Sequence, residues 1–366
     1  MKKVFTLFFM ASMALSALAQ LEDGFYRIKN VSSERYITMY DPYVLVNKGT
    51  GTVNLKALQT VSSWNKVRSH MGSVWYIKKK SGNQYDLYCQ HSSLGANSSG
   101  FYPSLVQING SYQIYGSYDG FTKYLNDADN ADDEDGNGYI NVTGTKRLNW
   151  SFIPIGGDNF VGIEPEVSVD GAYWATFVSG FPFKLGSGMK AYYINSVNDT
   201  GFAMKELGSE VPAKLPVLIR LKGSSASDNK ITLLTSTSAK VPSDNKMYGT
   251  WYSSLLGGKH EDWNVEYESN NRILGKANGH LAFVKASSSK LVGGKYIDHN
   301  RGYLAVSAAG ADNIIEATSD ITNSIQSIEQ TETEKGLYTL TGQRIPKGTT
   351  PRPGIYIKDG KKIVIK

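Results

Sequence analysis

The stretch LEDGFYRIKNVSSERYITMYDP, residues 21–42, contains two aromatic-rich runs separated by a polar turn at Ser32-Ser33. Successive side chains of a strand point to opposite faces, so Tyr26 and Ile28 share one face of the first run. We expect these two residues in a core. Similar short runs, bounded by turn residues, recur along the chain at intervals typical of sandwiches and barrels. The sequence therefore predicts an all-β fold.

Parts of the opening stretch recur further along the chain as a weak internal repeat. ERYITMYD is similar to TKYLNDAD, and tryptophan-containing runs end the first and last of these units. Repeated hairpins of this kind bury a shared core that no single unit could bury alone. The recurring triplets are Tyr26-Arg27-Ile28, Tyr85-Asp86-Leu87 and Tyr112-Gln113-Ile114, and the closing runs are Trp75-Tyr76-Ile77 and Trp150-Ser151-Phe152.

The pattern GFYRIKN…RYITMYD…WYI resembles the ricin-type β-trefoil family, in which three units surround a pseudo-threefold axis. The resemblance implies a trefoil-like module over residues 20–157, after a leader, and a glycan as ligand. The family's sugar-contacting Asp corresponds to Thr38 in the first unit and Asn126 in the last. Core packing is the alternative role for each aromatic residue. The candidate ligand-binding residues are Tyr40, Asp41, Tyr43, Asn126 and Asp127.

The second region, residues 158–312, contains apolar runs bounded by Gly and Pro, such as AYWATFVSGFPFKLGSGMKAYYIN and VPAKLPVLIRLKG. Such runs are typical of strands buried on the inner faces of a sandwich. The segment resembles β-sandwich modules of secreted proteins of the Bacteroidota. That resemblance implies an architectural role and assigns no active site.

The last region, residues 313–366, begins with a polar linker and continues into alternating runs, LYTLTGQRI and GIYIKDGKKIVIK. Asp359-Gly360 predicts a two-residue hairpin turn. We expect the isoleucines at 355, 357, 363 and 365 on one face and the lysines on the other. The segment resembles the C-terminal sorting domain of type IX secretion cargo, a small Ig-like sandwich, which implies an export machinery as a partner. A structural sandwich without a sorting role is the alternative.

The leader, residues 1–19, has a positive start, a short apolar run and the small-x-small site Ala17-Leu18-Ala19. These features predict a cleaved signal peptide and a protein that is secreted or on the outer cell surface. No later segment has the length of a transmembrane span. Removing Lys2 and Lys3 lowers the net charge from +6 to about +4, without the clustering of a nucleic-acid binder.

The acidic stretch DADNADDEDGNGYI, residues 127–140, matches the opening half of a calcium loop. Oxygen ligands at alternate positions converge on one ion, and Gly138 would permit the sharp turn. The closing acid is replaced by Gly144, with Asp127 and Asp129 as substitutes. An acidic turn without metal is the alternative. The candidate Ca²⁺ ligands are Asp133, Asp135, Asn137 and the carbonyl of Tyr139.

Catalytic signatures are weak. Cys89 lies on the apolar side of an alternating run and is expected to be buried. The scattered histidines, including the one in IDHN at 297–300, are expected to be ordinary surface groups. The absence of a clear catalytic motif favours a non-catalytic protein, and the resemblance to the β-trefoil family implies that it binds a glycan or a host or cell-surface glycoprotein. A polysaccharide or peptide hydrolase with its site in 158–312 and a protein-binding adhesin are the alternatives.

Overall fold

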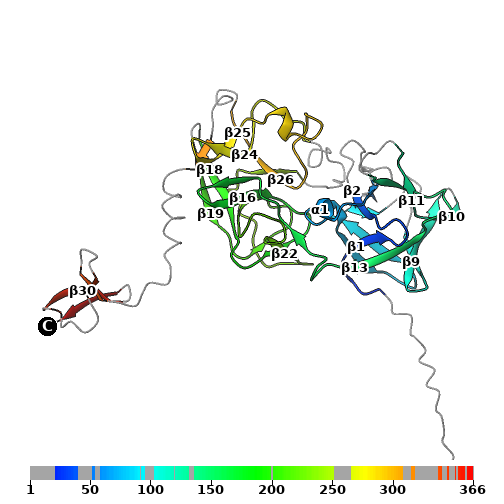
Figure 1. Cartoon of the computed structure of the whole chain (residues 1–366), viewed down its shortest axis with the longest axis horizontal. Helices are drawn as coiled ribbons and strands as arrows, with labels where there is room; N and C mark the ends of the chain where they lie inside the picture. Colours follow the sequence, from blue (N-terminus) through cyan, green and yellow to red (C-terminus); the bar gives the residue numbers. More distant parts are fainter. Residues whose placement is uncertain are drawn as a thin grey trace, which may run out of the picture.

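The computed structural model is almost entirely β-structure (Figure 1). None of the helices in the described part of the chain has the length and hydrophobicity of a membrane span. The leader lies outside the described residues. The structure describes residues 21–39, 52–53, 58–90, 92–94, 103–118, 120–131, 136–198, 201–250, 265–307, 315–317, 337–339, 344–345, 351, 353–358 and 361–365.

The first region is a 13-stranded sheet with two short helical turns, α1 and η2. Its elements are β1 (Gly24–Asn30), β2 (Tyr36–Met39), β3 (Thr52–Val53), β4 (Leu58–Val61), α1 (Trp64–Val67), η2 (Met71–Ser73), β5 (Trp75–Lys79), β6 (Tyr85–Cys89), β7 (Ser92–Leu94), β8 (Ser104–Ile108), β9 (Ser111–Tyr118), β10 (Phe121–Tyr124), β11 (Asn126–Asp129), β12 (Gly138–Asn141) and β13 (Asn149–Pro154).

This sheet closes on itself. Strand β1 pairs with both β5 and β13, β5 pairs with β6, and β9 pairs with both β8 and β13. The bridge between Gln84 and Ser104 joins the start of β6 to β8 and completes the ring. The remaining strands lie outside it; β2 with β4 and β11 with β12 are antiparallel pairs, and β3 with β7 is a parallel pair. This strand plan is compatible with the trefoil-like plan that the sequence predicts.

The internal repeat is visible in the core of the ring. The indole N–H of Trp75 donates to the Ile37 carbonyl (3.2 Å), and that of Trp150 donates to the Leu125 carbonyl (3.1 Å). Ile37 and Leu125 occupy the same position in the two similar runs RYI and KYL. Both tryptophans are fully buried. The equivalent apolar residues of the three triplets, Ile28, Leu87 and Ile114, are also fully buried, as is Cys89.

The second region contains a 10-stranded and a 4-stranded sheet. Its elements are β14 (Val161–Gly162), β15 (Val167–Val169), β16 (Ala172–Phe177), β17 (Phe183–Leu185), β18 (Lys190–Val197), β19 (Gly201–Glu206), β20 (Glu210–Val211), β21 (Val217–Leu221), β22 (Lys230–Leu233), β23 (Tyr248–Thr250), β24 (Asn271–Ala277), β25 (His280–Val284), η3 (Ser288–Lys290), β26 (Arg301–Ala305) and β27 (Ile315–Ala317).

The central strands β16, β21 and β18 are buried on both faces, which explains their nearly continuous apolar runs. One face, with Phe177 and Ile219, packs toward the 4-stranded sheet, and the other, with Trp174 and Leu218, faces β24–β26. Strand β27 lies in the segment expected to be a linker. It lies between β19 and β25 in the 10-stranded sheet and pairs with both.

The first and second regions share a core, and α1 lies where the two bodies meet (Figure 1). Phe25 of β1 packs against Phe181 with ring centroids 5.1 Å apart, and Met71 and Val74 belong to the apolar cluster of the second region. Phe25 lies on the β1 face opposite Tyr26 and Ile28. Both faces of β1 are therefore buried, one inside the ring and one against the second region.

The strand β1 also contributes Arg27, which is fully buried at this junction. Its Nη1 donates to the carbonyl of Phe160 and to Oδ1 of Asn159, both at 2.8 Å. Its Nη2 reaches the carbonyls of Val67 and Arg68 (3.2 and 3.3 Å), and its Nε donates to Ser73 Oγ. The guanidinium thus joins β1, the α1–η2 segment and the chain that enters the second region.

The last region is a 4-stranded sheet of β28 (Leu337–Thr339), β29 (Arg344–Ile345), β30 (Gly354–Lys358) and β31 (Lys361–Ile365). The expected hairpin of β30 with β31 is present, but the expected single apolar face is wrong. Because Lys358 pairs with Lys361, Ile355 lies opposite Val364, whereas Ile363 lies opposite Tyr356 on the other face. Tyr356 is buried, whereas Ile355 and Val364 are exposed.

The matching tryptophans give a test of the repeat. We expect Trp75→Phe and Trp150→Phe to lower the free energy of unfolding by similar amounts, about 1–3 kcal/mol each, because each leaves a buried carbonyl without its donor. Urea unfolding followed by circular dichroism measures this. A large loss of stability in one variant and no loss in the other would contradict the equivalence of the two units.

Candidate functional site

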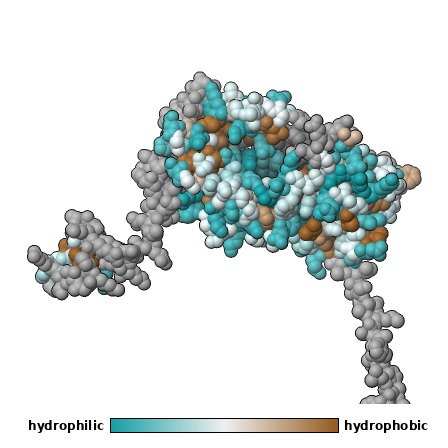
Figure 2. All heavy atoms as spheres, in the orientation of Figure 1, coloured by the Kyte–Doolittle hydropathy of each residue, from teal (hydrophilic) through white to brown (hydrophobic). Residues whose placement is uncertain are grey.

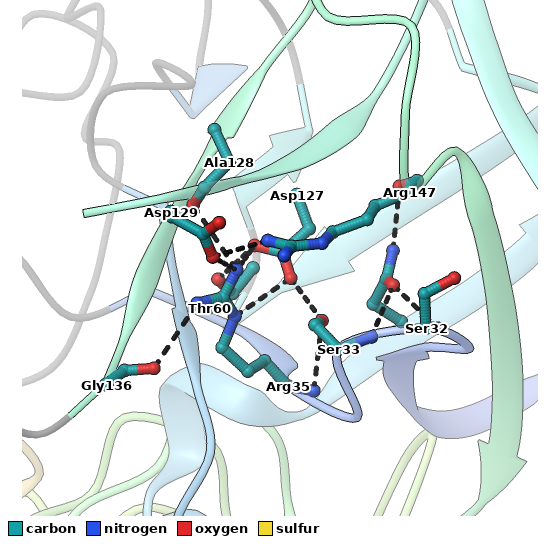
Figure 3. A network of polar contacts seen from close by, with 10 residues as sticks. Ser32, Ser33, Arg35, Thr60, Asp127, Ala128, Asp129, Gly136 and Arg147 are labelled. Carbon is teal, nitrogen blue, oxygen red and sulfur yellow. Dashed lines mark hydrogen bonds and ion pairs between the residues drawn. The ribbon is translucent and has the colours of Figure 1, made fainter. Parts of the chain in front are cut away.

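A densely bonded polar cluster of the first region centres on Arg35 and Asp127 (Figure 3). Arg35 Nε and Nη2 each lie 2.9 Å from one oxygen of the Asp127 carboxylate, a bidentate pair between two nearly inaccessible side chains. The hydroxyls of Thr60 (2.6 Å) and Ser33 donate to the same carboxylate. Breaking a buried pair by removing one partner typically costs about 3–5 kcal/mol. The cluster therefore fixes β2, β4 and β11 relative to one another.

The same guanidinium fixes both ends of the acidic loop that the sequence predicts as a calcium site. Arg35 Nη2 lies 3.0 Å from Asp129 Oδ1, and Nη1 donates to the Gly136 carbonyl (3.3 Å). Arg147 also donates to Asp129, and these two arginines hold the pKa of Asp129 below its ordinary value. Gly138 lies in β12, where a Cβ atom would come within 2.7 Å of Arg35 Cζ. The expectation that Gly138 forms a sharp turn is therefore wrong: it lies in a strand, and a glycine there permits the close approach of Arg35.

Asn126 and Gly144 form a turn contact instead of an open ligand position. Asn126 Oδ1 accepts from the Gly144 amide (3.1 Å), and a Cβ at Gly144 would come within 2.3 Å of the Asn126 amide nitrogen. Asn126 is buried, as is Asp127. In this structure the two predicted ligand-binding residues therefore support the site from beneath.

An accessible row lies on the opposite face of the same strands. Tyr139 of β12 is 44% exposed, and the strand register places it opposite Ala128 of β11 and Gln59 of β4. Side chains directly opposite each other across antiparallel strands are neighbours on one face of the sheet. We call Tyr139, Ala128 and Gln59 the outer row. It presents an aromatic ring, a small side chain and an amide.

The other predicted residues are distributed as follows. Asn137, a predicted Ca²⁺ ligand, is buried, and Tyr139 belongs to the outer row. Among the described residues, no group of three His, Cys, Asp or Glu side chains is placed to hold a metal ion. Tyr40, Asp41, Tyr43, Asp133 and Asp135 lie outside the described residues.

A second site lies between the first and second regions. A cleft of about 320 Å³ is lined by residues of both, at the lower end of the sizes that hold small molecules. Beside it, Asn300 Nδ2 donates to Gln90 Oε1 (2.6 Å) across the junction. The side chains that matter for its chemistry are Lys66, Ser69, His70, Glu164, Asp298 and His299.

The histidines of this cleft correct the expectation of ordinary surface groups. His70 is buried, and its ring lies 4.0 Å from that of His299. His299 Nδ1 lies 2.8 Å from Asp298 Oδ1. The expectation that neighbours in sequence point apart holds for a strand, but Asp298 and His299 precede β26 in a turn. Position in the sequence gave no signal that His70 and His299 would meet.

The buried environment of His70 favours its neutral form. Burial lowers the pKa of His70 well below its ordinary value, and His299 and Arg27 act in the same direction. His70 Nδ1 accepts from the Gly72 amide (3.0 Å), which a proton on that nitrogen would prevent. Burial opposes ionisation of Asp298, yet His299 and Arg301 hold the pKa of Asp298 well below its usual range.

An Asp–His pair in a cleft can orient an imidazole as a general base. The nearby thiol does not supply a nucleophile, because burial raises the pKa of Cys89 and its Sγ faces the Gly72 carbonyl at 3.4 Å. Ser69 contributes a hydroxyl-bearing side chain to the lining of the same cleft. The arrangement is suited to binding a small polar group at the junction.

These pKa shifts predict an acid-sensitive junction. A histidine with a lowered folded-state pKa contributes stability above its unfolded pKa of about 6.5 and loses it as the pH falls. We expect the free energy of unfolding to fall between pH 7 and pH 5, by at most about 1.4 kcal/mol per pH unit for this group. Because the pKa of Asp298 is also lowered, the free energy of unfolding should fall further below about pH 4.

Urea unfolding across this pH range measures the effect in wild type, His70→Asn and His280→Asn. Asn at position 70 can still accept from the Gly72 amide but does not titrate, so its pH dependence should be shallower. His280 is exposed and serves as the matched control. Identical pH profiles for wild type and His70→Asn would refute the assignment.

No protein-family model matches the chain, and no curated protein matches it. Among solved structures, the Rhizoctonia solani agglutinin is similar at 18% sequence identity, covering 37% of this chain and 98% of its own, with a TM-score of 0.19.

Proposed function

We propose that this chain is an exported, non-catalytic protein that binds glycans through its first region. The observation that carries the proposal is the outer row, in which an exposed Tyr139 lies beside Gln59 on strands fixed from beneath by the Arg35–Asp127 pair. Sugar rings present C–H surfaces to aromatic faces and hydroxyls to amides. The outer row offers both kinds of partner on a rigid support.

The expected affinity of one such site is modest. An aromatic contact contributes on the order of 1 kcal/mol, so useful binding needs several contacts or several sites. A closed ring built from repeated hairpins provides related surfaces on one scaffold. Glycans attached to a host or cell-surface protein would present several copies of the ligand and favour such multivalent binding.

The cellular context of the proposal comes from the sequence. The leader supports export, and the hairpin of β30 and β31 supports a role of the last region in sorting to the outer surface. Calcium is part of the proposal because of the acidic sequence of residues 127–140. Arg35 and Arg147 already pair with Asp127 and Asp129, so the ion would take its ligands from the other acids of that stretch.

A hydrolase is the second candidate, favoured by one observation. His299 bonded to Asp298 forms an oriented base in a cleft beside Ser69. Hydrolysis of a glycan or peptide that is abolished by His299→Gln would support this candidate. Retention of any such activity in the variant would remove it.

A glycan array on the mature protein, with and without calcium, tests the proposal. We expect binding to a subset of glycans and a loss of about fivefold in affinity for Tyr139→Ala, equivalent to about 1 kcal/mol. Tyr248→Ala, which removes an exposed tyrosine of the second region, is the matched control and should bind like wild type. The absence of binding to any glycan on the array, or an equal loss of affinity in the two variants, would contradict the proposal.

A further inference from the structure

A row of aromatic side chains crosses the junction between the first and second regions. Tyr36 of β2 lies 6.1 Å from Trp64 of α1, and Trp64 lies 5.8 Å from Phe160, measured between ring centroids. All three rings are partly exposed. We call Tyr36, Trp64 and Phe160 the junction row. It shares no residue with the outer row or with the lining of the histidine cleft.

Lysines lie at both ends of the junction row. Lys29 Nζ is 5.4 Å from the Tyr36 ring centroid, and Lys230 Nζ is 4.4 Å from that of Phe160. Lys230 is exposed and has no carboxylate partner within the described residues. Lys29 lies 3.6 Å from Glu34, whose side chain is largely exposed, so this pair is weak and exchangeable. The two ends of the row therefore carry accessible positive charge.

The junction row rests on the buried Arg27. The Arg27 guanidinium carbon lies 5.0 Å from the Trp64 ring centroid, and the Phe160 carbonyl accepts from the same guanidinium. Side chains that are already fixed lose little conformational entropy on binding, which favours affinity. Figure 2 shows that apolar side chains on the displayed face gather in small separate patches amid polar surface. Rigid aromatic rings flanked by lysines fit an elongated polar ligand better than an apolar one.

We propose that the junction row binds an acidic oligosaccharide, with sugar rings against the aromatic faces and carboxylate or sulfate groups at Lys29 and Lys230. This inference rests on the proposed glycan-binding function and specifies its ligand as anionic. Aromatic faces accept the C–H surface of a sugar, and each ammonium supplies three donors for an anionic oxygen. The nearby carboxylate of Glu164 is bonded to Arg68 (3.0 Å), so it does not cancel the charge of either lysine.

Calorimetric titration of the mature protein with an oligogalacturonate and with its neutral methyl ester tests the proposal. The two ligands have the same ring and differ in charge. We expect the acid to bind more tightly than the ester and its binding to weaken as the salt concentration is raised. The double variant Lys29→Gln/Lys230→Gln should lose about tenfold in affinity for the acid. Lys123→Gln, which removes a lysine stacked on Phe121 elsewhere in the first region, is the matched control.

Phe160→Leu separates the aromatic contribution from the charge, since it keeps an apolar side chain but removes the ring face. This variant should weaken the binding of both the acid and its ester. Equal affinity for the acid and its ester, or an unaltered preference in the double variant, would overturn this proposal while leaving glycan binding intact. A single-stranded oligonucleotide that binds as tightly as the acid would also overturn it. Failure of all saccharides here and on the array would instead refute the proposed function.

Discussion

The structure depends on one buried cation. Arg27 projects from β1 into the junction and bonds to backbone carbonyls of the α1–η2 segment and of Asn159 and Phe160. Burial lowers the pKa of Arg27 to about 9, so the guanidinium keeps its charge at neutral pH. A buried charge is tolerated only when its donors are satisfied. The five N–H groups of a guanidinium have a fixed geometry, so the acceptors around Arg27 must be placed to match it. The first and second regions therefore cannot separate without exposing or orphaning this group.

The internal repeat explains why the residue at the position of Arg27 can differ between units. The residues equivalent to Arg27 in the other triplets are Asp86 and Gln113, whereas the flanking Tyr and aliphatic positions are kept for the core. The inward positions are constrained by the shared core of the ring. The middle position of each triplet faces away from the core of the ring. One unit can therefore use it for the junction while another leaves it near solvent.

Alternation and repetition made much of the fold predictable. They correctly placed Tyr26 and Ile28 in a core, and similar runs correctly indicated equivalent units. The candidate sites were less predictable, because they depend on contacts between distant segments. Arg27 meets Asn159 and Phe160 across 132 and 133 residues of chain, and no local pattern distinguishes its face from a solvated one. The register error in the last hairpin arose because identical spacing of isoleucines on two strands does not place them on one face.

Two accessible surfaces result from this scaffold. The outer row is supported by the buried Arg35–Asp127 pair, and the junction row is supported by Arg27. In both, a buried arginine fixes the backbone while an aromatic side chain remains exposed. For the binding function proposed above, this arrangement would supply rigid aromatic surfaces for ligands bound at several weak sites.

The most direct test of the central role of Arg27 is hydrogen–deuterium exchange of the mature Arg27→Lys variant at neutral pH. Lysine keeps the positive charge but cannot donate to the same set of carbonyls. We expect faster exchange at residues 67–74 and 159–163 with unchanged protection in β16 and β21, since the junction loosens while the second core stays folded. Protection at the junction equal to that of wild type would contradict the account.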